Sequence, residues 1–461
     1  MPPLLAQGAR VRCLARDSVR LNYGWSSQVE MVTGDILDPE TLKRALAGVS
    51  TAYYLIHSMA SGPDYVERDL VAARSFAAAA SLAGVEKIIY LGGLADPDTP
   101  IGKHMLSRIQ TGQALRQGSV PVIEFRASVI IGPGSISFEM IRYLSEQFPL
   151  LMGPPWLHNR AQPVAIQNVL DYLLAALAFP ASESKVYEIG GPDRMTYAET
   201  MLVYARLRGL KRRLLTLPVV PLGLMAFFVD RLTPVPSSIA RPLIDSMRGE
   251  SIVRDNAVRR DFPQISLLDY DASVTAALGK LSPEHLEPAL YESTQSVIII
   301  KDEGFFIDHY RTSLDQKPEY VYRAFSGLGG KRGWLYLNKL WQLRGLLDKL
   351  LGGPGMRGRQ DENELRAGAI LDFYRVEVLE PGRMLRLRAD LKSPGAGWME
   401  WRLRTQPDGK VLLLQTAFFA PKGITGFLYW YLLYPLHRLV FTGLLNAIAR
   451  RAHELQQASS N

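Results

Sequence analysis

The segment GKHMLSRIQTG places a histidine and an arginine four residues apart, at His104 and Arg108. Residues with this spacing share one face of a helix, so both side chains can point at the same ligand. Imidazole titrates near neutral pH, which makes His104 a candidate general acid. Arg108 is too basic to shuttle protons but can hold ribose hydroxyls or a phosphate. The competing interpretation, that both are exposed helix residues without chemistry, stays open.

Three further candidates follow two predicted strands. Arg16 ends the strand ARVRCLA, where nucleotide-binding sheets place a group that contacts the adenosine ribose. An arginine there suits a 2′-phosphate and favours NADP over NAD, although it is also an ordinary surface residue. Asp35 can accept a hydrogen bond from an adenine amino group while Ile36 packs on the ring. Asp35 also fits as a helix cap, a role that Asp38 can take instead.

Other chemistries find no support in the chain. Its seven histidines are scattered without a metal-ligand spacing, and its single cysteine, Cys13, excludes a disulfide framework and a multi-cysteine metal site. Cys13 lies in a predicted buried strand, where a thiol serves as a small core residue. No Gly-x-Ser-x-Gly motif supports a nucleophilic serine. The net charge of +8 comes in short basic clusters without interleaved aromatic residues, which argues against nucleic-acid binding.

The elements that carry these residues alternate short apolar runs with helical periods. A chain of 461 residues, 47% hydrophobic and 21% charged, predicts two or three globular domains. Strands rich in Ile, Val and Tyr alternate with predicted helices at residues 39–47, 64–83, 102–116, 137–146 and 166–178. This order indicates βαβ units around a parallel sheet, a doubly wound Rossmann-like α/β domain. Residues from 195 to about 280 add helices and prolines, typical of a smaller lobe.

After residue 282 the pattern changes to that of an α+β domain. One strand in GFFIDHYRTSL precedes helices at residues 318–325 and 334–351, and two strand pairs follow, around a Glu-Pro-Gly turn and around Asp408-Gly409. A helix at residues 424–456 closes the chain. This order predicts a curved antiparallel sheet gripping a helix, around either a ligand cavity or a packed aromatic core. The predicted domains are 1–194, 195–281 and 282–461.

Two apolar stretches, residues 214–229 and 423–445, make poor membrane spans. The first is short and broken by prolines, and the second carries Pro435, His437 and Arg438 near its middle. Either stretch could lie on a membrane surface. No signal peptide is visible, so the sequence predicts a cytoplasmic protein, with peripheral membrane contact as an option.

Residues 9 to about 280 resemble the extended and atypical short-chain dehydrogenases/reductases, in particular the NmrA-like branch that includes bacterial nucleoside-diphosphate-sugar epimerases. The matching segments occur in family order and spacing: RVRCLARD, GDILDPETLKRALAGVSTAYYLIHSM, GVEKIIYLGGLA, VPVIEFRASVIIGPGS, QPVAIQNVLDYL and YEIGGPD. The branch is also similar to the reductase-like accessory subunit of respiratory complex I. Residues from about 290 to 450 resemble a bacterial domain of unknown function, similar to the helix-grip, START-like superfamily that holds apolar ligands.

The resemblance implies a Ser or Thr after the fifth strand and a Tyr-x-x-x-Lys pair on the next helix, and this chain departs from both. Gly93 stands at the serine position, and His104 and Arg108 occupy the Tyr-x-x-x-Lys spacing. By matching position, the resemblance lines the nicotinamide half of the cofactor site with residues at two strand ends: Ile56, His57, Ala127, Ser128 and Val129. His57 is either a substrate contact or a satisfied polar residue.

The family pattern also implies a first strand and a Gly-x-x-Gly-x-x-Gly turn, whose backbone N–H groups approach the cofactor pyrophosphate. The chain opens MPPLLAQGARVRCLARD, and its first glycine, Gly8, ends a helix instead. We therefore expect the native product to begin about 20 residues earlier than Met1.

Three functions remain open at this stage. The first is an NAD(P)H-binding oxidoreductase that reduces an apolar carbonyl or quinone-like compound, with His104 as the proton donor. The second is a non-catalytic nucleotide-binding, assembly or ligand-binding module, favoured by the missing serine, tyrosine and lysine. The third is a sugar-nucleotide epimerase or dehydratase, which would also need the missing tyrosine. NADP, or else NAD, is the expected cofactor.

Overall fold

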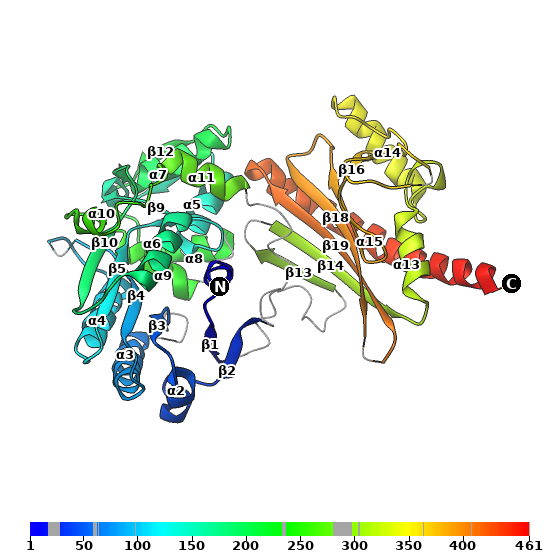
Figure 1. Cartoon of the computed structure of the whole chain (residues 1–461). Helices are drawn as coiled ribbons and strands as arrows, with labels where there is room; N and C mark the ends of the chain where they lie inside the picture. The colour runs from blue at the N-terminus through cyan, green and yellow to red at the C-terminus, as the bar shows by residue number, and fades with distance from the viewer. Residues whose placement is uncertain are drawn as a thin grey trace. The chain divides into compact units, whose positions relative to one another are not determined.

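The computed structural model of the chain describes residues 1–16, 28–58, 62, 64–96, 98–232, 237–279, 297–302, 305–362, 364–406 and 408–460. The chain forms two compact units, Met1–Ala289 and Leu290–Asn461 (Figure 1). The domain boundary predicted at residues 281–282 lies outside the described residues.

The N-terminal unit is built on a parallel sheet of four strands in the order β10-β5-β4-β3. These strands are β3 (Thr51–Tyr54), β4 (Lys87–Gly93), β5 (Val122–Ala127) and β10 (Lys185–Ile189). Gly93 and Ile189 both lie beside Ala127 in the strand register. The carboxyl ends of β4, β5 and β10 therefore meet at one edge of the sheet.

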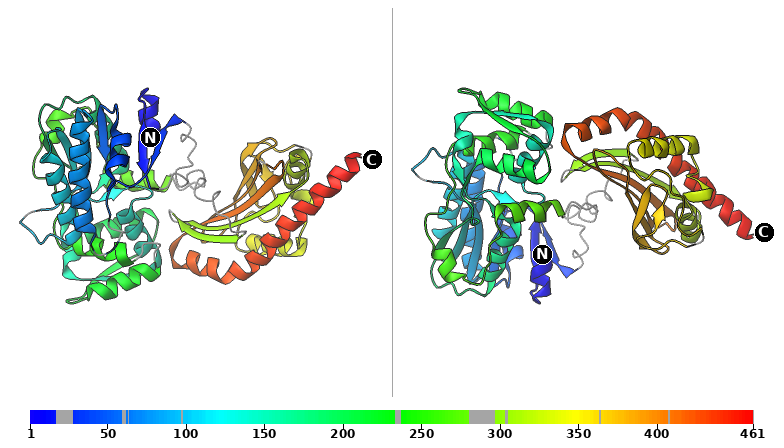
Figure 2. Two further views of the ribbon diagram at one scale, coloured as in Figure 1. Left: turned by 90° about the horizontal axis from the view of Figure 1, so that it is seen from below. Right: turned by 90° about the horizontal axis from the view of Figure 1, so that it is seen from above.

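Helices cover both faces of this sheet (Figure 2). The principal covering helices are α3 (Tyr65–Leu82), α4 (Lys103–Arg116) and α6 (Ile166–Ala178). On one face, Tyr90 of β4 packs with side chains of α3 and α4, and on the other, Phe125 of β5 packs with side chains of α6. Both strand faces are apolar because both are covered. The predicted doubly wound Rossmann-like α/β fold is confirmed.

A separate parallel pair joins β1 (Arg12–Ala15) to β2 (Glu30–Thr33). The short helix α1 (Pro2–Ala6) precedes it, and Gly8 follows the helix with a φ of +77°, a conformation that favours glycine. In the described part of the chain this pair has no ladder to β3, so it forms a sheet separate from the four-stranded one. Cys13, expected in the core, is only half-buried on this pair.

A helical lobe completes the N-terminal unit. Its helices are α5 (Ile136–Gln147), α7 (Tyr197–Leu207), α8 (Leu222–Leu232), α9 (Ser237–Ser246) and α11 (Tyr270–Gly279). Two other helices lie outside the lobe: α10 (Ala257–Asp261) packs against β10, and α2 (Pro39–Leu46) lies nearer the N-terminus. Short elements connect them: β6 (Ile130–Ile131), β7 (Leu150–Gly153), η4 (Pro155–His158), β8 (Arg160–Ala161), β9 (Val164–Ala165), β11 (Met195–Thr196) and β12 (Arg213–Thr216). Met140, Val229 and Ile244 pack α5, α8 and α9 into one cluster.

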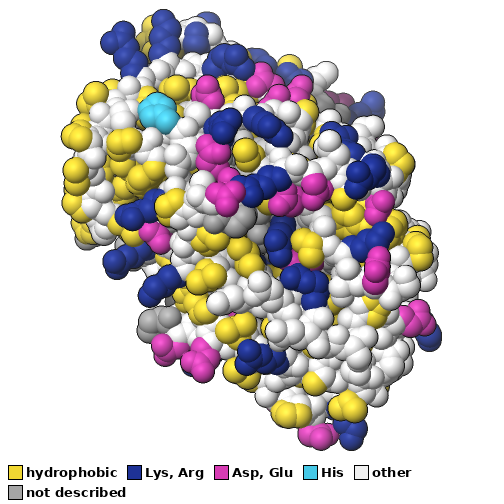
Figure 3. Space-filling model, turned by 90° about the vertical axis from the view of Figure 1, so that its left-hand side faces the viewer, with side chains coloured by type: hydrophobic (Ala, Val, Ile, Leu, Met, Phe, Trp, Pro, Cys, Tyr) yellow, Lys and Arg dark blue, Asp and Glu magenta, His cyan; other side chains and the backbone are white. Residues whose placement is uncertain are grey.

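Charges of both signs lie on the face of the N-terminal unit drawn in Figure 3. Among the described residues shown there, Lys and Arg side chains are interspersed with Asp and Glu and with apolar side chains. Exposed ion pairs of this unit include Arg160–Glu250 at 3.0 Å and Arg206–Asp271 at 2.7 Å.

The C-terminal unit contains an antiparallel sheet of seven strands in the order β13-β14-β19-β18-β17-β16-β15. They are β13 (Val297–Asp302), β14 (Phe305–Leu314), β15 (Ile370–Leu371), β16 (Tyr374–Glu380), β17 (Met384–Ala389), β18 (Gly395–Thr405) and β19 (Val411–Pro421). The two predicted strand pairs are β16–β17 and β18–β19. Their turns contain Gly382 and Gly409, with φ of +73° and +82°, which explains why both turns use glycine.

Helices α13 (Pro318–Ser326) and α15 (Gly423–Ser460) pack against this sheet, and α14 (Asn338–Leu350) follows the turn η6 (Gly330–Arg332). An aromatic core lies between them: the rings of Trp334 and Trp341 stack with centroids 4.5 Å apart, and Trp401 and Phe441 are buried in the same cluster. Among the described residues, α15 is the one helix long and apolar enough to cross a membrane, judged by length and composition.

Candidate functional site

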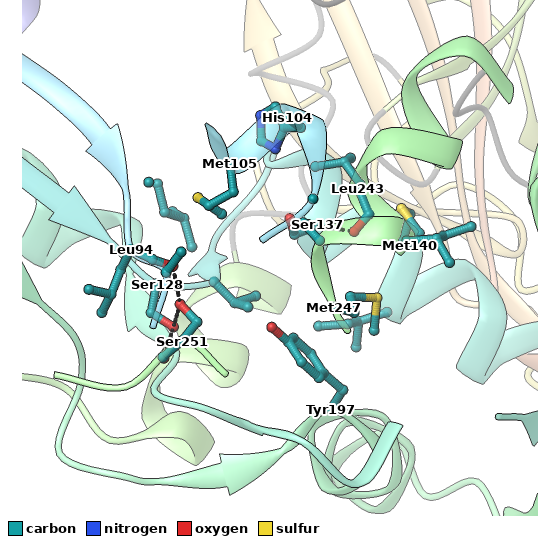
Figure 4. Close-up of a pocket in the computed structure, with 18 of the residues that line it drawn as sticks. Leu94, His104, Met105, Ser128, Ser137, Met140, Tyr197, Leu243, Met247 and Ser251 are labelled. Atoms are coloured by element: carbon teal, nitrogen blue, oxygen red, sulfur yellow. Dashed lines mark hydrogen bonds between the residues drawn. The ribbon is translucent and has the colours of Figure 1, made fainter. Parts of the chain in front are cut away.

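A cavity of about 300 Å³ lies in the N-terminal unit, where residues at the ends of β4 and β5 meet the helical lobe (Figure 4). Most of its lining is apolar, and methionines are prominent: Met105, Met140, Met152, Met201, Met225 and Met247. Ligands of parallel α/β folds bind outside the carboxyl ends of the strands, and apolar cavities with a few polar groups are typical binding sites. We therefore take this cavity as the candidate functional site.

The cavity brings together seven of the residues predicted from the sequence. They are His57, Gly93, His104, Arg108, Ala127, Ser128 and Val129. Their strands carry them to one place because the chain leaves β3, β4 and β5 at the same edge of the sheet. Four other predicted residues do not line the cavity: Arg16, Asp35, Ile36 and Ile56.

Two serines fix one wall of the cavity. Ser128 Oγ donates to the backbone carbonyl of Ser251 at 2.8 Å, and Ser251 Oγ donates to the carbonyl of Leu94 at 2.7 Å (Figure 4). The Ser128 hydroxyl also accepts from the backbone N–H of Gln162 at 3.1 Å. These bonds tie the segments after β4 and β5 to the lobe, so Ser128 has a structural role whatever the ligand.

His104 and His57 face the cavity as a pair of rings with centroids 6.3 Å apart. Burial, and then the positive charge of Arg108 and the nearby His57, lower the pKa of His104 to about 4. Burial and Arg108 also lower the pKa of His57. A group with a pKa of 4 is protonated in roughly one molecule per thousand at pH 7. His104 is therefore a neutral imidazole that can donate or accept one hydrogen bond per nitrogen.

Arg108 binds the backbone at the ends of two strands. Its guanidinium donates to the carbonyl of Leu91 and, at 3.3 Å, to the carbonyl of Ile56. The same group lies over the ring of Tyr90, 5.1 Å from its centroid. These contacts give the Arg108 side chain a structural role at the edge of the cavity.

The space that a serine at position 93 would need is occupied by the end of the Met105 side chain. A Cβ built at Gly93 would lie 2.3 Å from Sδ of Met105, on the first turn of α4. Met105 thus fills the volume that a side chain at position 93 would need.

The three residues expected at the adenosine half lie around β1 and β2. Arg16 is exposed just after β1. Asp35 Oδ1 accepts from the N–H of Leu37 at 2.9 Å, while Asp38 caps α2 by accepting from the N–H groups of Glu40 and Thr41. Asp38 is therefore the cap of α2, and the Asp35 carboxylate accepts a hydrogen bond within its own turn. Ile36 is half-buried against the cluster that contains β3 and β4.

Tyr197 is a cavity residue that the sequence analysis missed. It begins α7, and its hydroxyl points into the cavity from the side opposite His104 (Figure 4). Thr196 and Glu199 form a capping box in which each side chain accepts a hydrogen bond from the other residue's N–H, at 3.1 and 2.7 Å. Burial and the charge of Glu250 raise the pKa of Tyr197, so it is a neutral phenol. The cap predicts the helix start but says nothing of what the next side chain faces.

The residues present suit the nicotinamide half of a dinucleotide. Nδ1 of His104 is buried without a hydrogen-bond partner in the described structure, and a carboxamide or a ribose hydroxyl would satisfy it. The small residue Ala127 lets a ring approach the end of β5.

Family models match both units. Residues 1–115 match the model described as NAD(P)H-binding, and residues 302–444 match a protein of unknown function, DUF2867. The chain is 30% identical over 213 residues to the (4-alkanoyl-5-oxo-2,5-dihydrofuran-3-yl)methyl phosphate reductase of Streptomyces griseus. This match covers 44% of this chain and 68% of that relative. It is 26% identical over 243 residues to the ceramide reductase of Caulobacter vibrioides, and this match covers 51% of this chain and 75% of the relative.

Solved structures with a similar fold include a reductase and an epimerase. The triphenylmethane reductase of Citrobacter sp. complexed with NADP(H) is 20% identical with a TM-score of 0.47, covering 60% of this chain and 94% of its own. A nucleoside-diphosphate-sugar epimerase from Staphylococcus aureus is 14% identical with a TM-score of 0.48, covering 59% and 93%. On the sequence matches, the chain belongs to the NAD(P)H-binding, NmrA-like reductases of the atypical short-chain dehydrogenase/reductase family and carries a DUF2867 domain behind them.

Proposed function

We propose that this protein is an NADPH-dependent reductase that acts on an apolar carbonyl or quinone-like compound in the cavity of the N-terminal unit. The observation that carries the proposal is the cavity itself: about 300 Å³ with a largely apolar lining at the ends of β4 and β5. An apolar wall with few polar groups selects an apolar ligand and orients it through those groups. NADPH is preferred over NADH in this proposal because Arg16 follows β1, where an arginine suits a 2′-phosphate.

The chemistry divides between the cofactor and the chain. When bound, a reduced nicotinamide supplies a hydride to the carbonyl carbon, the cofactor is oxidised, and the carbonyl oxygen takes up a proton to give the alcohol. His104 has a pKa of about 4 and is therefore neutral, so it does not act as an imidazolium acid. Its role is that of a hydrogen-bond donor that orients the ligand or the nicotinamide carboxamide. The Tyr197 phenol is the candidate proton donor because an alkoxide is more basic than a phenolate.

NADPH and NADH titrations of the full chain, followed by nicotinamide fluorescence and then by absorbance during turnover of quinones and aldehydes, test the proposal. We expect tighter binding of NADPH than of NADH, and oxidation of NADPH with at least one member of the panel. Tyr197→Phe should lower kcat by about 10²- to 10⁴-fold while leaving the Kd for NADPH unchanged. Failure of NADPH to bind would refute the proposal.

A second function, nucleotide binding without turnover, is favoured by one specific observation. Position 93 has no hydroxyl, and Met105 occupies the space where one would stand. Tight NADPH binding with no oxidation across the whole panel would favour this alternative over the reductase.

We also propose a helix-grip architecture for the DUF2867 unit. The packing of α13 and α15 against an antiparallel sheet supports it. An apolar ligand held by such a unit would suit the class of substrate proposed above.

A further inference from the structure

The outer face of α14 is apolar. Leucines at spacings of three and four face away from the core: Leu343, Leu346, Leu347 and Leu350 are 50%, 56%, 47% and 76% exposed. The opposite side of the helix is buried through Trp341, Gly345 and Asp348. An amphipathic helix normally buries such an apolar stripe, whereas α14 exposes it on the side opposite its buried residues.

The first half of α15 repeats this arrangement. Its inner side is buried through Phe427 and Trp430. Its outer side exposes Ile424, Leu428, Leu432, Leu436 and Leu439, and Leu432 is 80% exposed. Monomeric soluble proteins rarely leave contiguous apolar patches of this kind uncovered, and such patches mark partner or membrane contacts.

The two helices are neighbours in the C-terminal unit. Arg344 of α14 donates to the hydroxyl of Tyr429 of α15 at 3.3 Å. The ring of Tyr336, just before α14, lies against Gly443 so closely that a Cβ there would be 2.0 Å from it. We call the exposed leucines of α14 and the exposed apolar residues of α15 the apolar helix face.

Cations outnumber acids on and beside the two helices, although Arg357 pairs with Asp390 at 2.8 Å. Between residues 331 and 360 the chain has seven Lys or Arg residues and a single acid, Asp348. Asp348 is buried and accepts from the N–H groups of Gly355 at 2.9 Å and Lys392 at 2.7 Å, so it adds no surface charge. From Gly423 to His453 there is no Asp or Glu. Exposed cations on or next to the two helices include Lys339, Lys349, Lys392 and Lys422.

We propose that the apolar helix face docks this protein peripherally on a bilayer that contains anionic lipid. Leucines enter the boundary of the acyl chains, and the lysines meet the headgroup phosphates. A second copy of the chain fits this face poorly, because two cationic surfaces would be brought together. The helix lies on the membrane and does not cross it, since Phe427 and Trp430 are already buried against the sheet. The proposal is independent of the reductase function.

Vesicle flotation with the full chain tests it. The probes are vesicles of phosphatidylcholine alone and of phosphatidylcholine with about one third phosphatidylglycerol. We expect flotation with the anionic vesicles, and a loss of flotation in about 0.5 M salt because screening removes the headgroup attraction. Lys339→Glu with Lys349→Glu should lower the vesicle partition coefficient by about fivefold per residue.

The decisive variants replace exposed leucines. Leu346→Ser with Leu350→Ser, and Leu432→Ser with Leu436→Ser, should each lower the partition coefficient at least about tenfold, because each removes two inserted side chains. Leu82→Ser is the matched control, since Leu82 is 91% exposed on α3 in the other unit. Far-ultraviolet circular dichroism and thermal melting confirm that each variant is folded.

Two results would overturn the proposal. One is equal flotation of the wild type and both leucine variants. The other is no flotation, combined with a dimer that light scattering detects in the wild type and not in the leucine variants, which would assign the face to a second copy of the chain.

Discussion

Arg108 of α4 and Tyr90 of β4 make two reciprocal contacts. The guanidinium of Arg108 lies over the Tyr90 ring, 5.1 Å from its centroid, and the Tyr90 hydroxyl donates back to the carbonyl of Arg108 at 2.8 Å. The guanidinium also donates to the carbonyls of Leu91 and Ile56. This reciprocal contact joins α4 to β3 and β4 at the edge of the cavity.

Replacing Arg108 should therefore destabilise the N-terminal unit. Arg108→Met leaves two strand-end carbonyls without their donor, and we expect the free energy of unfolding to fall by about 2–3 kcal/mol. Urea denaturation measures it, with Lys103→Met at the exposed start of α4 as the control. A variant with unchanged stability and weakened NADPH affinity would instead make Arg108 a cofactor ligand.

Restoring the family's serine should displace the end of the Met105 side chain. Gly93→Ser brings its Cβ against Met105 Sδ, the mobile end of an unbranched side chain, so we expect the free energy of unfolding to fall by no more than about 1 kcal/mol. Adding Met105→Ala should make the loss larger, because it removes a side chain that lines the cavity. Thermal melting compares both with Gly223→Ser, a glycine whose added Cβ would meet nothing within 4 Å. A loss of about 3 kcal/mol or more in Gly93→Ser alone would show that Met105 cannot move aside.

His437 should make the C-terminal unit sensitive to acid. Its ring stacks on Phe441 with centroids 5.2 Å apart, and burial and Arg344 lower its pKa to about 4. The unfolded chain binds a proton near pH 6.5 and the folded chain only near pH 4, so stability falls as the pH falls through that window. The loss approaches roughly 3 kcal/mol for one such group.

His437→Phe should remove this loss, because it deletes the titrating group and keeps the stacked ring. Urea denaturation at pH 7 and pH 4, followed by tryptophan fluorescence, compares the variant with wild type and with His453→Phe at an exposed site of α15. Burial lowers the pKa of His309 to about 4, an effect of the same sign, and raises the pKa of Asp308 to about 6, an effect of opposite sign. Both groups are present in both proteins, so their effects cancel in the comparison. The same pH slope in His437→Phe and wild type would contradict the assignment.

A buried ion pair between β17 and β18 should be costly to break. Arg386 and Glu400 are 0% and 2% exposed and approach to 2.7 Å, and Arg402 contacts the same carboxylate at 3.2 Å. Glu400→Gln should lower the free energy of unfolding by about 3–5 kcal/mol because it leaves buried cations without a counter-charge. Adding Arg386→Met to Glu400→Gln should cost much less than the sum of the two single changes, and strict additivity in urea denaturation would refute the coupling.

Local patterns predicted the elements well. The helix expected at residues 166–178 is observed as Ile166–Ala178, and both predicted hairpins form around glycines with positive φ. Such features depend on residues close in sequence. The pairing of β1 with β2, without a ladder to β3, depends on contacts that no local pattern contains.

The candidate site was predicted only in part, because local spacing does not contain the contacts between residues that are distant in sequence. Helical spacing shows that His104 and Arg108 share a face, and both line the cavity. Spacing cannot show that the guanidinium of Arg108 binds backbone carbonyls, or that burial lowers the pKa of His104 to about 4. Tyr197 comes from a helix far along the chain, so only the folded structure brings it to the cavity.

The methionine-rich wall of the cavity has a consequence for selectivity. Unbranched thioether side chains change rotamer at little cost and remould around different shapes. The six methionines that line the cavity therefore make its outline compliant, although its total volume stays limited to about 300 Å³. The affinity of such a pocket should depend on the volume of a ligand more than on its shape. Compounds of different shapes should therefore bind with similar affinity, until the largest no longer fit.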